Sequence, residues 1–417
     1  MPKLIIQGGK KLKGELTIAG MKNAATPILA ATLLTTEECV IGNVPRITDV
    51  EKMLAIIQSS GVQAQWTGPH ELTVRALQVD PTAINRKAIC ALRSSVLLAG
   101  PLLVRAGMLD LPEPGGCIIG NRPLDTHLHV FGTMGVEVKR NNGTYEFRGV
   151  PKASTIVLPE FSVTATENAI MAAVCTVGVT TIKLAAAEPH VQDLCALLIK
   201  MGGRISGVGT HTLVIDGVET LHGATHTIIP DQVEVGTFAV LAAVTRSDLF
   251  LRPVFTEHIE SIGTMLKAAG VRYETKKGEL RIRPSAHLQG FKVQAMPYPG
   301  FPTDLQAPCA VLATQCKGTS LIHDPLFEGR MGYVHELIKM GANAIVADPH
   351  RVIITGPTPL YGQEIKSLDL RAGATLVIAG LLAEGETVIH DAEVIDRGYE
   401  DMEGRLKSLG AEIKRVS

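Results

Sequence analysis

One loop-forming stretch places a cysteine in surroundings that suit chemistry. The segment from Leu111 to His129 reads LPEPGGCIIGNRPLDTHLH, and its prolines and glycines predict a loop because both disfavour a helix interior. Cys117 is therefore expected on a loop, where a thiol is more reactive than in a core. Arg122 follows five residues later, and a nearby cation favours the thiolate and binds anionic substrates. A glycine-rich surface turn that merely contains a cysteine is the alternative.

Several charged residues lie at the starts of apolar segments. Lys22 begins the stretch KNAATPILAATLL, where its charge opposes the helix dipole unless an anion binds there too; a side chain that reaches solvent is the alternative. Asp304 stands just before another such stretch and could serve as an N-cap, the commoner role of such an aspartate. Four arginines also interrupt the pattern: Arg93, Arg330, Arg371 and Arg397. Together with the lysine and the thiol, they predict a clamp for a multiply anionic substrate.

These residues belong to six copies of one unit. A helix-like run that ends in glycine and continues into a short strand recurs at intervals of 67 to 74 residues, at Gly61, Gly135, Gly202, Gly270, Gly341 and Gly410. A glycine after the last helical turn adopts a left-handed conformation without a Cβ clash. Each copy then continues into a hairpin, with turn residues such as Asn142-Gly143.

Each copy also has an earlier helix that is apolar on nearly all sides and should be buried. These helices are expected within residues 24–34, 89–100, 165–175, 235–245, 304–314 and 372–382. The predicted unit is therefore a buried helix, a strand, an amphipathic helix and a hairpin.

The two ends of the chain are expected to meet. The sixth copy ends with only its first hairpin strand, and KLIIQGG near the start supplies a strand that could complete it. We therefore predict an α/β fold of two pseudo-symmetric three-repeat domains, one spanning residues 22–229 and the other residues 1–21 plus 230–417. Two crossings join them and leave an interdomain cleft, a favoured position for ligands.

The amino-acid composition and net charge argue against two classes of binding partner. The 417 residues are 46% apolar and 19% charged with a net charge of −1, which predicts neither a nucleic-acid partner nor an anionic membrane surface. We see no signal peptide and no apolar run long enough to span a membrane, so a cytoplasmic location is expected.

The cysteines and histidines predict neither disulfides nor a metal site. The cysteine count is odd and no CxxC pair occurs, and the pairs His127/His129 and His222/His226 lack further ligands at suitable spacing. Apart from Cys117, the cysteines are interpreted as core residues: Cys39, Cys90, Cys175, Cys195, Cys309 and Cys316.

Seven segments together resemble one family. GMKNAATPILAA, PGGCxIGxRPxD, HxIIPDxxExGTF, YPGFPTDLQAP, FExRxxxxxEL, DLRAGAxLVxAGLxAxG and IDRGYExxxxxLxxLGA are similar to segments of the UDP-N-acetylglucosamine 1-carboxyvinyltransferases, enolpyruvyl transferases that open peptidoglycan synthesis. The resemblance runs along essentially the whole chain. It implies two inside-out α/β barrel domains of three units each, in agreement with the six repeats.

The resemblance also implies a reaction and its residues. The enolpyruvyl group of phosphoenolpyruvate moves to the 3′-hydroxyl of UDP-N-acetylglucosamine, with release of phosphate. Cys117 matches the family's general acid and Asp304 its base, while Lys22, Arg122 and Arg397 match the groups that hold phosphoenolpyruvate. Further cleft positions match Asn23, Arg93, Arg330 and Arg371. Contacts to the nucleotide sugar are expected at Arg122, Pro123, Leu124, Asp125, Thr126, Ser162, Val163, Thr164 and Leu326. The resemblance implies no cofactor, metal or obligate protein partner, and it implies sensitivity to fosfomycin at Cys117.

The chain departs from the family pattern at a few positions. It has LPEPGGC where the family usually has LPGGC, Thr126 for a usual leucine, Thr164 for a usual glycine and Met331 for a usual phenylalanine. Transfer to another acceptor, shikimate 3-phosphate or a different nucleotide, is therefore the alternative. The cysteine loop argues against shikimate 3-phosphate. Two remoter readings are a nucleic-acid clamp, which needs a basic inner face, and a homologue that only binds nucleotide sugars, which needs neither acid nor base.

Overall fold

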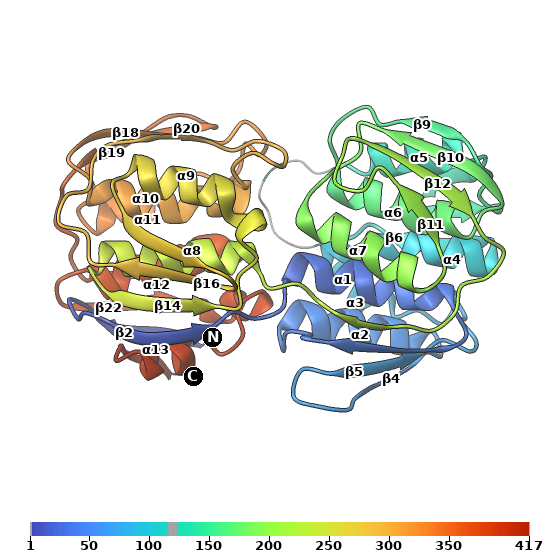
Figure 1. Ribbon diagram of the computed structural model, residues 1–417, viewed down its shortest axis with the longest axis horizontal. Coiled ribbons are helices and arrows are strands. Elements are labelled where there is room, and N and C mark those ends of the chain that lie inside the picture. Colours follow the sequence, from blue (N-terminus) through green and yellow to red (C-terminus); the bar gives the residue numbers. More distant parts are fainter. Residues whose placement is uncertain (1, 116–119, 121–122, 417) are drawn as a thin grey trace. The chain divides into compact units, whose positions relative to one another are not determined.

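Two compact units make up the described part of the chain. The computed structural model describes residues 2–115, 120 and 123–416 (Figure 1). One unit, called the Lys22 unit, comprises residues 20–115 and 123–229; the other, called the Asp304 unit, comprises residues 2–19, 120 and 230–416. Each unit has its own hydrophobic core.

The Lys22 unit has three sheets, ordered β13-β3-β5-β4, β6-β8-β7 and β11-β12-β10-β9. Its strands are β3 (Glu38–Gly42), β4 (Gln63–Trp66), β5 (Leu72–Arg75), β6 (Met108–Pro112), β7 (Glu137–Asn141), β8 (Thr144–Arg148), β9 (Thr155–Val157), β10 (Gly178–Lys183), β11 (Arg204–Ser206), β12 (Thr212–Gly217) and β13 (Thr225–Thr227). Its helices are α1 (Lys22–Ala31), α2 (Thr48–Ser59), α3 (Arg86–Cys90), α4 (Ala99–Ala106), α5 (Asp125–Thr133), α6 (Val163–Val174) and α7 (Pro189–Lys200), with 3-10 turns η1 (Thr32–Leu34) and η2 (Arg93–Leu98).

The Asp304 unit also has three sheets, ordered β21-β22-β1-β23, β15-β16-β14-β2 and β17-β18-β20-β19. Its strands are β1 (Lys3–Gln7), β2 (Lys13–Thr17), β14 (Asp248–Arg252), β15 (Arg272–Lys276), β16 (Glu279–Arg283), β17 (Lys292–Gln294), β18 (Gly318–His323), β19 (Ala344–Asp348), β20 (Arg351–Gly356), β21 (Glu364–Lys366), β22 (Glu386–His390) and β23 (Glu412–Val416). Its helices are α8 (Gln232–Val244), α9 (Glu260–Ala268), α10 (Gln306–Thr314), α11 (Tyr333–Lys339), α12 (Leu370–Leu382) and α13 (Met402–Ser408), with 3-10 turns η3 (Thr256–Ile259), η4 (Thr303–Leu305) and η5 (Ala392–Arg397).

Among the described residues, five of the six sheets share one four-strand pattern and the sixth has three of its strands, which confirms the repeat. In β19, β20, β18 and β17, for example, an antiparallel hairpin pairs with a third strand, and a fourth runs parallel to the third. The sheet β6-β8-β7 lacks the parallel strand among the described residues. All six expected glycines follow an amphipathic helix and have φ between 78° and 107°, the left-handed region in which glycine has no Cβ to clash.

The first strand completes the sixth sheet, as predicted. Strand β1 pairs antiparallel with both β22 and β23, so Leu4 lies opposite Ile389 on one side and Arg415 on the other. The hairpin that the other copies build from adjacent strands is therefore assembled here from the two ends of the chain.

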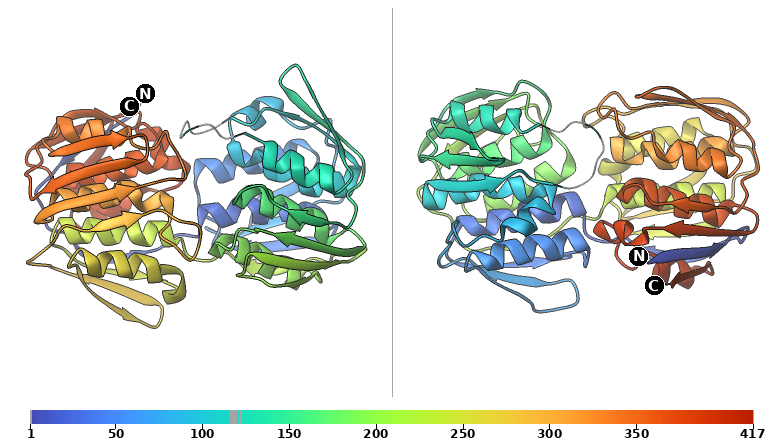
Figure 2. Two further views of the ribbon diagram at one scale, coloured as in Figure 1. Left: turned by 90° about the horizontal axis from the view of Figure 1, so that it is seen from above. Right: turned by 180° about the vertical axis from the view of Figure 1, so that it is seen from behind.

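Apolar helices fill the inside of each unit, and the sheets lie outside (Figure 2). In the Asp304 unit, α10 contacts both α8 and α12, and every residue of α8 is buried. In the Lys22 unit, α6 contacts both α4 and α7. The absence of a polar face explains this burial, because a helix that is apolar all round has no side suited to water.

One expected helix is interrupted. Residues 89–100 were expected to form a single buried helix, but α3 ends at Cys90, and a 3-10 turn precedes α4. Leu92 between them is extended, with φ −139° and ψ 114°. The Ser95 hydroxyl donates to the Leu92 carbonyl at 2.7 Å, a local bond of the kind that competes with a regular helix.

The cysteine prediction is also wrong at one position. Cys39, Cys195, Cys309 and Cys316 are buried and Cys175 is partly buried, whereas Cys90 is exposed. Only Ile89 is buried in the five-residue helix α3, so this short helix leaves its last side chain in solvent.

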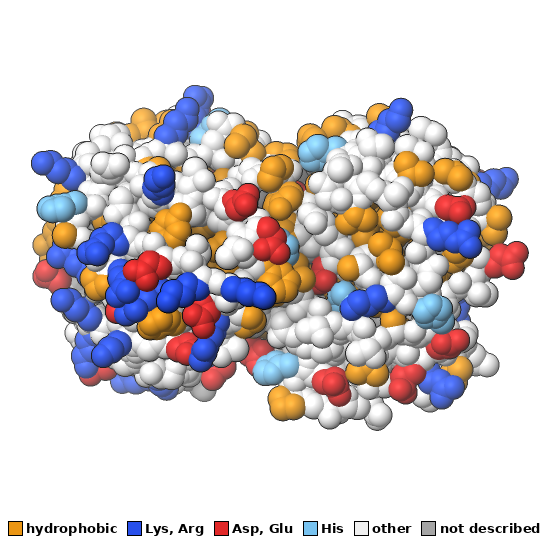
Figure 3. Space-filling model, viewed as in Figure 1, with side chains coloured by type: hydrophobic (Ala, Val, Ile, Leu, Met, Phe, Trp, Pro, Cys, Tyr) orange, Lys and Arg blue, Asp and Glu red, His pale blue; other side chains and the backbone are white. Residues whose placement is uncertain are grey.

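Charges of both signs alternate on the face of the Asp304 unit that carries β14 and β16 (Figure 3). Arg281 pairs with Asp248 at 2.7 Å and Arg283 with Glu274 at 2.7 Å. Across the described residues, no helix combines the length and the apolar character needed to cross a membrane.

Candidate active site

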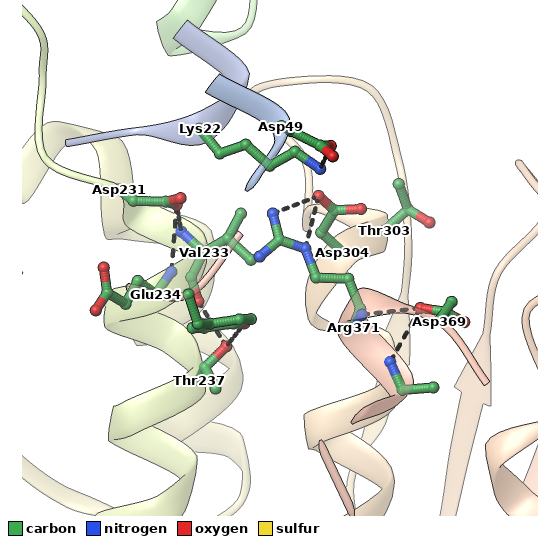
Figure 4. Close-up of polar contacts among 12 residues, drawn as sticks. Lys22, Asp49, Asp231, Val233, Glu234, Thr237, Thr303, Asp304, Asp369 and Arg371 are labelled. Carbon is green, nitrogen blue, oxygen red and sulfur yellow. Dashed lines mark hydrogen bonds and ion pairs between the residues drawn. The ribbon is translucent and has the colours of Figure 1, made fainter. Parts of the chain in front are cut away.

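Asp304 lies in η4, just before α10, and its carboxylate contacts two arginines, of which Arg371 is labelled in Figure 4. Arg330 Nη2 donates to Oδ1 at 2.9 Å, and Arg371 donates to Oδ2 from Nη2 at 3.0 Å and from Nε at 3.2 Å. The N-cap of α10 is Leu305, so Asp304 does not cap that helix. The N-cap alternative is therefore wrong, because the carboxylate faces two guanidinium groups that favour its ionised form.

Arg371 is held at the start of α12. Asp369 caps this helix by accepting from the backbone N–H groups of Arg371 at 2.8 Å and Ala372 at 3.1 Å. Burial is the largest single influence and lowers the pKa of Arg371, but the charges of Asp304 and Asp231 together with Tyr399 outweigh it and hold the pKa above its usual value. The guanidinium lies over the Tyr399 ring, 5.5 Å from its centroid, and Tyr399 Oη lies 2.9 Å from Thr237 Oγ1. A fixed cation therefore stands beside the carboxylate.

Arg330 joins Asp304 to the loop that follows β18. Its Nη1 donates to Thr303 Oγ1 at 2.9 Å, and Thr303 donates in turn to Asp324 at 2.5 Å. Burial raises the pKa of Asp324, and the bond from Thr303 opposes this. Asp324 also accepts from the Leu326 backbone N–H at 3.0 Å, which leaves the Leu326 side chain 40% exposed. The loop is thereby anchored and presents Leu326 to solvent.

Arg397 is the last residue of η5 and is partly buried. The neighbouring Asp396 accepts from Arg415 at 2.7 and 2.9 Å, which anchors the end of this turn to β23.

In the Lys22 unit, the first residue of α1 forms a buried ion pair. Lys22 Nζ lies 2.8 Å from Asp49 Oδ2, with the two side chains 16% and 3% exposed. Lys22 therefore does not extend into solvent, which rules out that alternative. Asp49 lies in the first turn of α2, where the helix dipole favours an acid. Asn23 follows in α1 and is partly buried.

Arg93 begins η2 and contacts both stems of the cysteine loop. It donates to the Pro114 and Pro123 carbonyls, each at 3.4 Å. Cys117 and Arg122, which lie between those stems in the sequence, are outside the described residues. Their expected positions stay predictions.

The expected nucleotide-sugar residues lie at the starts of α5 and α6. Ser162 caps α6 by accepting from Ala165 N at 3.4 Å, and Val163 and Thr164 form its first turn. Before and within α5, Pro123 and Asp125 are exposed while Leu124 and Thr126 are buried.

Two hydrogen bonds link these starts. Thr126 Oγ1 donates to Glu160 at 2.8 Å, and His127 Nε2 lies 3.1 Å from Thr164 Oγ1. Thr126 and Thr164, the two threonines that depart from the family pattern, therefore each form one of these two hydrogen bonds.

Three polar residues near these groups were not predicted from the sequence. Asp49 pairs with Lys22, Asp231 caps α8 by accepting from Val233 N at 2.8 Å and Glu234 N at 3.2 Å, and His127 contacts Thr164. Asp231 lies within the motif HxIIPDxxExGTF, which was a usable signal. The sequence contains no signal for the contacts of Asp49 and His127, because their partners are distant along the chain.

The chain matches the family model described as EPSP synthase (3-phosphoshikimate 1-carboxyvinyltransferase) over residues 6–406. A UDP-N-acetylglucosamine 1-carboxyvinyltransferase from Bradyrhizobium diazoefficiens is 43% identical, with 99% of this chain and 97% of that protein covered. One from Koribacter versatilis is 40% identical, with 100% and 97% covered.

Solved structures show the same fold. The enolpyruvyl transferase NikO from Streptomyces tendae superposes with a TM-score of 0.91 at 26% identity, covering 100% of this chain and 99% of that one. EPSP synthase from Acinetobacter baumannii superposes with a TM-score of 0.76 at 19% identity, with both chains fully covered. The architecture is of the inside-out α/β barrel type.

Proposed function

This chain belongs to the enolpyruvyl transferase family, and from that premise we propose how its residues carry out the family's reaction. The chain transfers the enolpyruvyl group of phosphoenolpyruvate to the 3′-hydroxyl of UDP-N-acetylglucosamine with release of phosphate, the first committed step of peptidoglycan synthesis. The observation that carries this conclusion is 40–43% identity to enzymes of that name over 99–100% of the chain.

Asp304 is the general base. The sugar hydroxyl must lose its proton as it attacks the enol carbon, and a carboxylate is a suitable acceptor. Arg330 and Arg371 hold Asp304 from two sides, at 2.9 and 3.0 Å, so its oxygens are restricted in direction. This fixed orientation supports the role, because proton transfer depends on geometry as well as on basicity.

Lys22, Arg122 and Arg397 bind the phosphate and carboxylate of phosphoenolpyruvate. Lys22 starts a ten-residue helix whose N-terminal amides add positive potential, and Asp49 restrains its ammonium group at 2.8 Å. A cation in this position stabilises charge that shifts towards the departing phosphate. Asn23 and Arg93 complete the surroundings of the donor.

Cys117 is the general acid that delivers a proton to the methylene carbon. A thiol on a loop beside a cation is suited to this exchange and to a covalent adduct with the donor. Alkylation of the same thiol would inactivate the enzyme, so fosfomycin is expected to inhibit it.

The nucleotide sugar contacts Arg122 to Thr126, Ser162 to Thr164, and Leu326. The exposed side chain of Leu326 and the start of α6 support this assignment, since a helix N-terminus attracts phosphate groups. The domain of residues 22–229 thus contributes the cysteine loop and the donor lysine. The domain of residues 1–21 plus 230–417 contributes the base and the arginine clamp. Both act on small-molecule substrates in the cytoplasm.

Phosphate release tests the proposal. Wild type and Cys117→Ala are assayed with phosphoenolpyruvate and either UDP-N-acetylglucosamine or shikimate 3-phosphate. We expect release with the nucleotide sugar alone, and its loss in the variant. Release that survives in Cys117→Ala contradicts the acid assignment, and no release with the nucleotide sugar contradicts the acceptor.

A further inference from the structure

We propose that the Thr164 hydroxyl donates a hydrogen bond to an acceptor oxygen of UDP-N-acetylglucosamine, and that buried His127 and Asn168 orient it for this purpose. The inference rests on the proposed function, which supplies the ligand. Its own basis is a chain of hydrogen bonds from the core of the Lys22 unit to the first turn of α6.

Asn168 fixes the direction of this chain of bonds. It is fully buried in α6, and its Oδ1 accepts from the Gly100 backbone N–H at 2.8 Å. Its Nδ2 donates to the Val96 carbonyl at 2.9 Å. The amide oxygen and nitrogen are therefore distinguished by their partners, and only a donor remains to face the third contact.

That third contact is His127, which is 4% exposed. Its Nδ1 lies 3.1 Å from Asn168 Nδ2, so Nδ1 must accept and cannot carry a proton. The ring proton consequently resides on Nε2. This nitrogen lies 3.1 Å from Thr164 Oγ1 and donates to it.

Thr164 then has a hydroxyl proton to give. A hydroxyl has one proton and two lone pairs, and one lone pair is taken by His127. Among the described residues, the histidine is the one hydrogen-bond partner of the Thr164 side chain. The side chain lies in the first turn of α6 and is partly exposed, so its proton is directed away from His127 and can reach a ligand.

The neighbouring Thr126 holds the two segments together. Its hydroxyl donates to Glu160 at 2.8 Å, so the starts of α5 and α6 are linked by two bonds, from adjacent residues of α5. A donor fixed in this way loses little conformational freedom when a ligand binds.

Equilibrium binding of UDP-N-acetylglucosamine, measured by calorimetry without phosphoenolpyruvate, tests the proposal. Thr164→Val removes the hydroxyl at nearly constant shape and should weaken binding roughly 3- to 10-fold, the usual range for one neutral hydrogen bond. Thr164→Ser retains the hydroxyl and should bind within about twofold of wild type. In turnover, Thr164→Val should raise KM for the nucleotide sugar and leave kcat and KM for phosphoenolpyruvate unchanged.

Two further variants separate the donor role from a structural one. Thr176→Val removes a hydroxyl that donates to the Ala172 carbonyl at 2.8 Å, beyond the other end of α6, and should leave binding unchanged. His127→Phe should weaken binding about as much as Thr164→Val, and the double variant should be no weaker than either.

Two results would overturn the inference: wild-type affinity in Thr164→Val, or equal weakening in Thr164→Val and Thr164→Ser. A wild-type protein that fails to bind UDP-N-acetylglucosamine would instead contradict the proposed function.

Discussion

The buried helices of the two units begin differently. In the Asp304 unit, an aspartate lies at each of these starts: Asp231 and Asp369 are the N-caps of α8 and α12, and Asp304 is the middle residue of η4, which leads into α10. In the Lys22 unit, the corresponding helices begin at Lys22, Arg93 and Ser162. One repeated unit therefore places acids at the helix starts of one domain and mostly cations at those of the other.

The difference shows where function overrides local preference. An aspartate at a helix start is stabilised by the free N–H groups, and Asp231 and Asp369 are used in this way. Asp304 is the exception, since its carboxylate bonds to arginines rather than to the helix. Lys22 opposes the dipole of α1 and is compensated by Asp49. The two sites that depart from the rule are those assigned to base and donor binding.

Replacing the exceptional aspartate should have the largest effect. Asp304→Asn removes the base but keeps its size, and kcat should fall roughly 10²- to 10⁴-fold. Asp401→Asn is a matched control, because Asp401 caps α13 and asparagine caps equally well. Steady-state phosphate release measures both. A near-normal kcat in Asp304→Asn would contradict the role of Asp304 as base. Asp304 would then have no more catalytic importance than the helix caps Asp231 and Asp369.

Each unit also has a buried glutamate whose pKa is raised, Glu234 in the Asp304 unit and Glu167 in the Lys22 unit. Burial raises the pKa of Glu234 in α8 from 4.5 to about 7, although its partner Arg405 opposes this. Burial also raises the pKa of Glu167 in α6 well above 4.5, and the charge of Glu188 adds to it. A raised carboxyl pKa stabilises the fold below the unfolded value of 4.5, and this contribution is lost as pH rises to the folded value.

Wild type should therefore lose stability from pH 4.5 upward. In wild type, the part of this loss in unfolding free energy that comes from Glu234 should be at most about 3 kcal/mol and should be complete near pH 7. Glu234→Gln should abolish that part. Glu167→Gln should remove more, over a range that extends to higher pH. Urea unfolding between pH 5 and 9 measures both slopes. Equal slopes in all three proteins would mean that neither carboxyl is perturbed.

The cation at the start of α1 should have an intermediate effect. Lys22→Gln removes a charge-assisted contact to phosphoenolpyruvate, and kcat/KM for this substrate should fall about 10- to 100-fold. Lys87→Gln changes an exposed lysine of the same unit and is expected to behave as wild type. An unchanged kcat/KM in Lys22→Gln would assign its ion pair with Asp49 to structure alone.

Loss of an ordinary cap should have the smallest effect. Asp369→Ala removes the acceptor for two N–H groups of α12 and should lower the free energy of unfolding by about 1 kcal/mol, while Asp369→Asn should restore most of it. Urea unfolding midpoints measure both. A loss in Asp369→Asn as large as in Asp369→Ala would mean that charge, rather than capping, matters at this position.

The repeated architecture follows from local patterns in the amino-acid sequence. Glycines spaced at regular intervals, apolar helices and hairpin turns are local patterns, and each predicted an element that the structure contains. The completion of the sixth sheet by β1 followed from counting strands. The exceptions were also local, since Leu92 interrupts an expected helix and Cys90 lies exposed.

The contacts of the polar residues, by contrast, depend on how the helices and strands pack. Asp304 bonds to Arg371, 67 residues away, and His127 to Thr164, 37 residues away. The sequence marked most of these residues as unusual but left their roles open between cap, solvent-exposed side chain and site. Periodicity reports which face of an element is buried, whereas partners on different elements meet only when the elements pack. The direction of each hydrogen bond therefore depends on the assembled core.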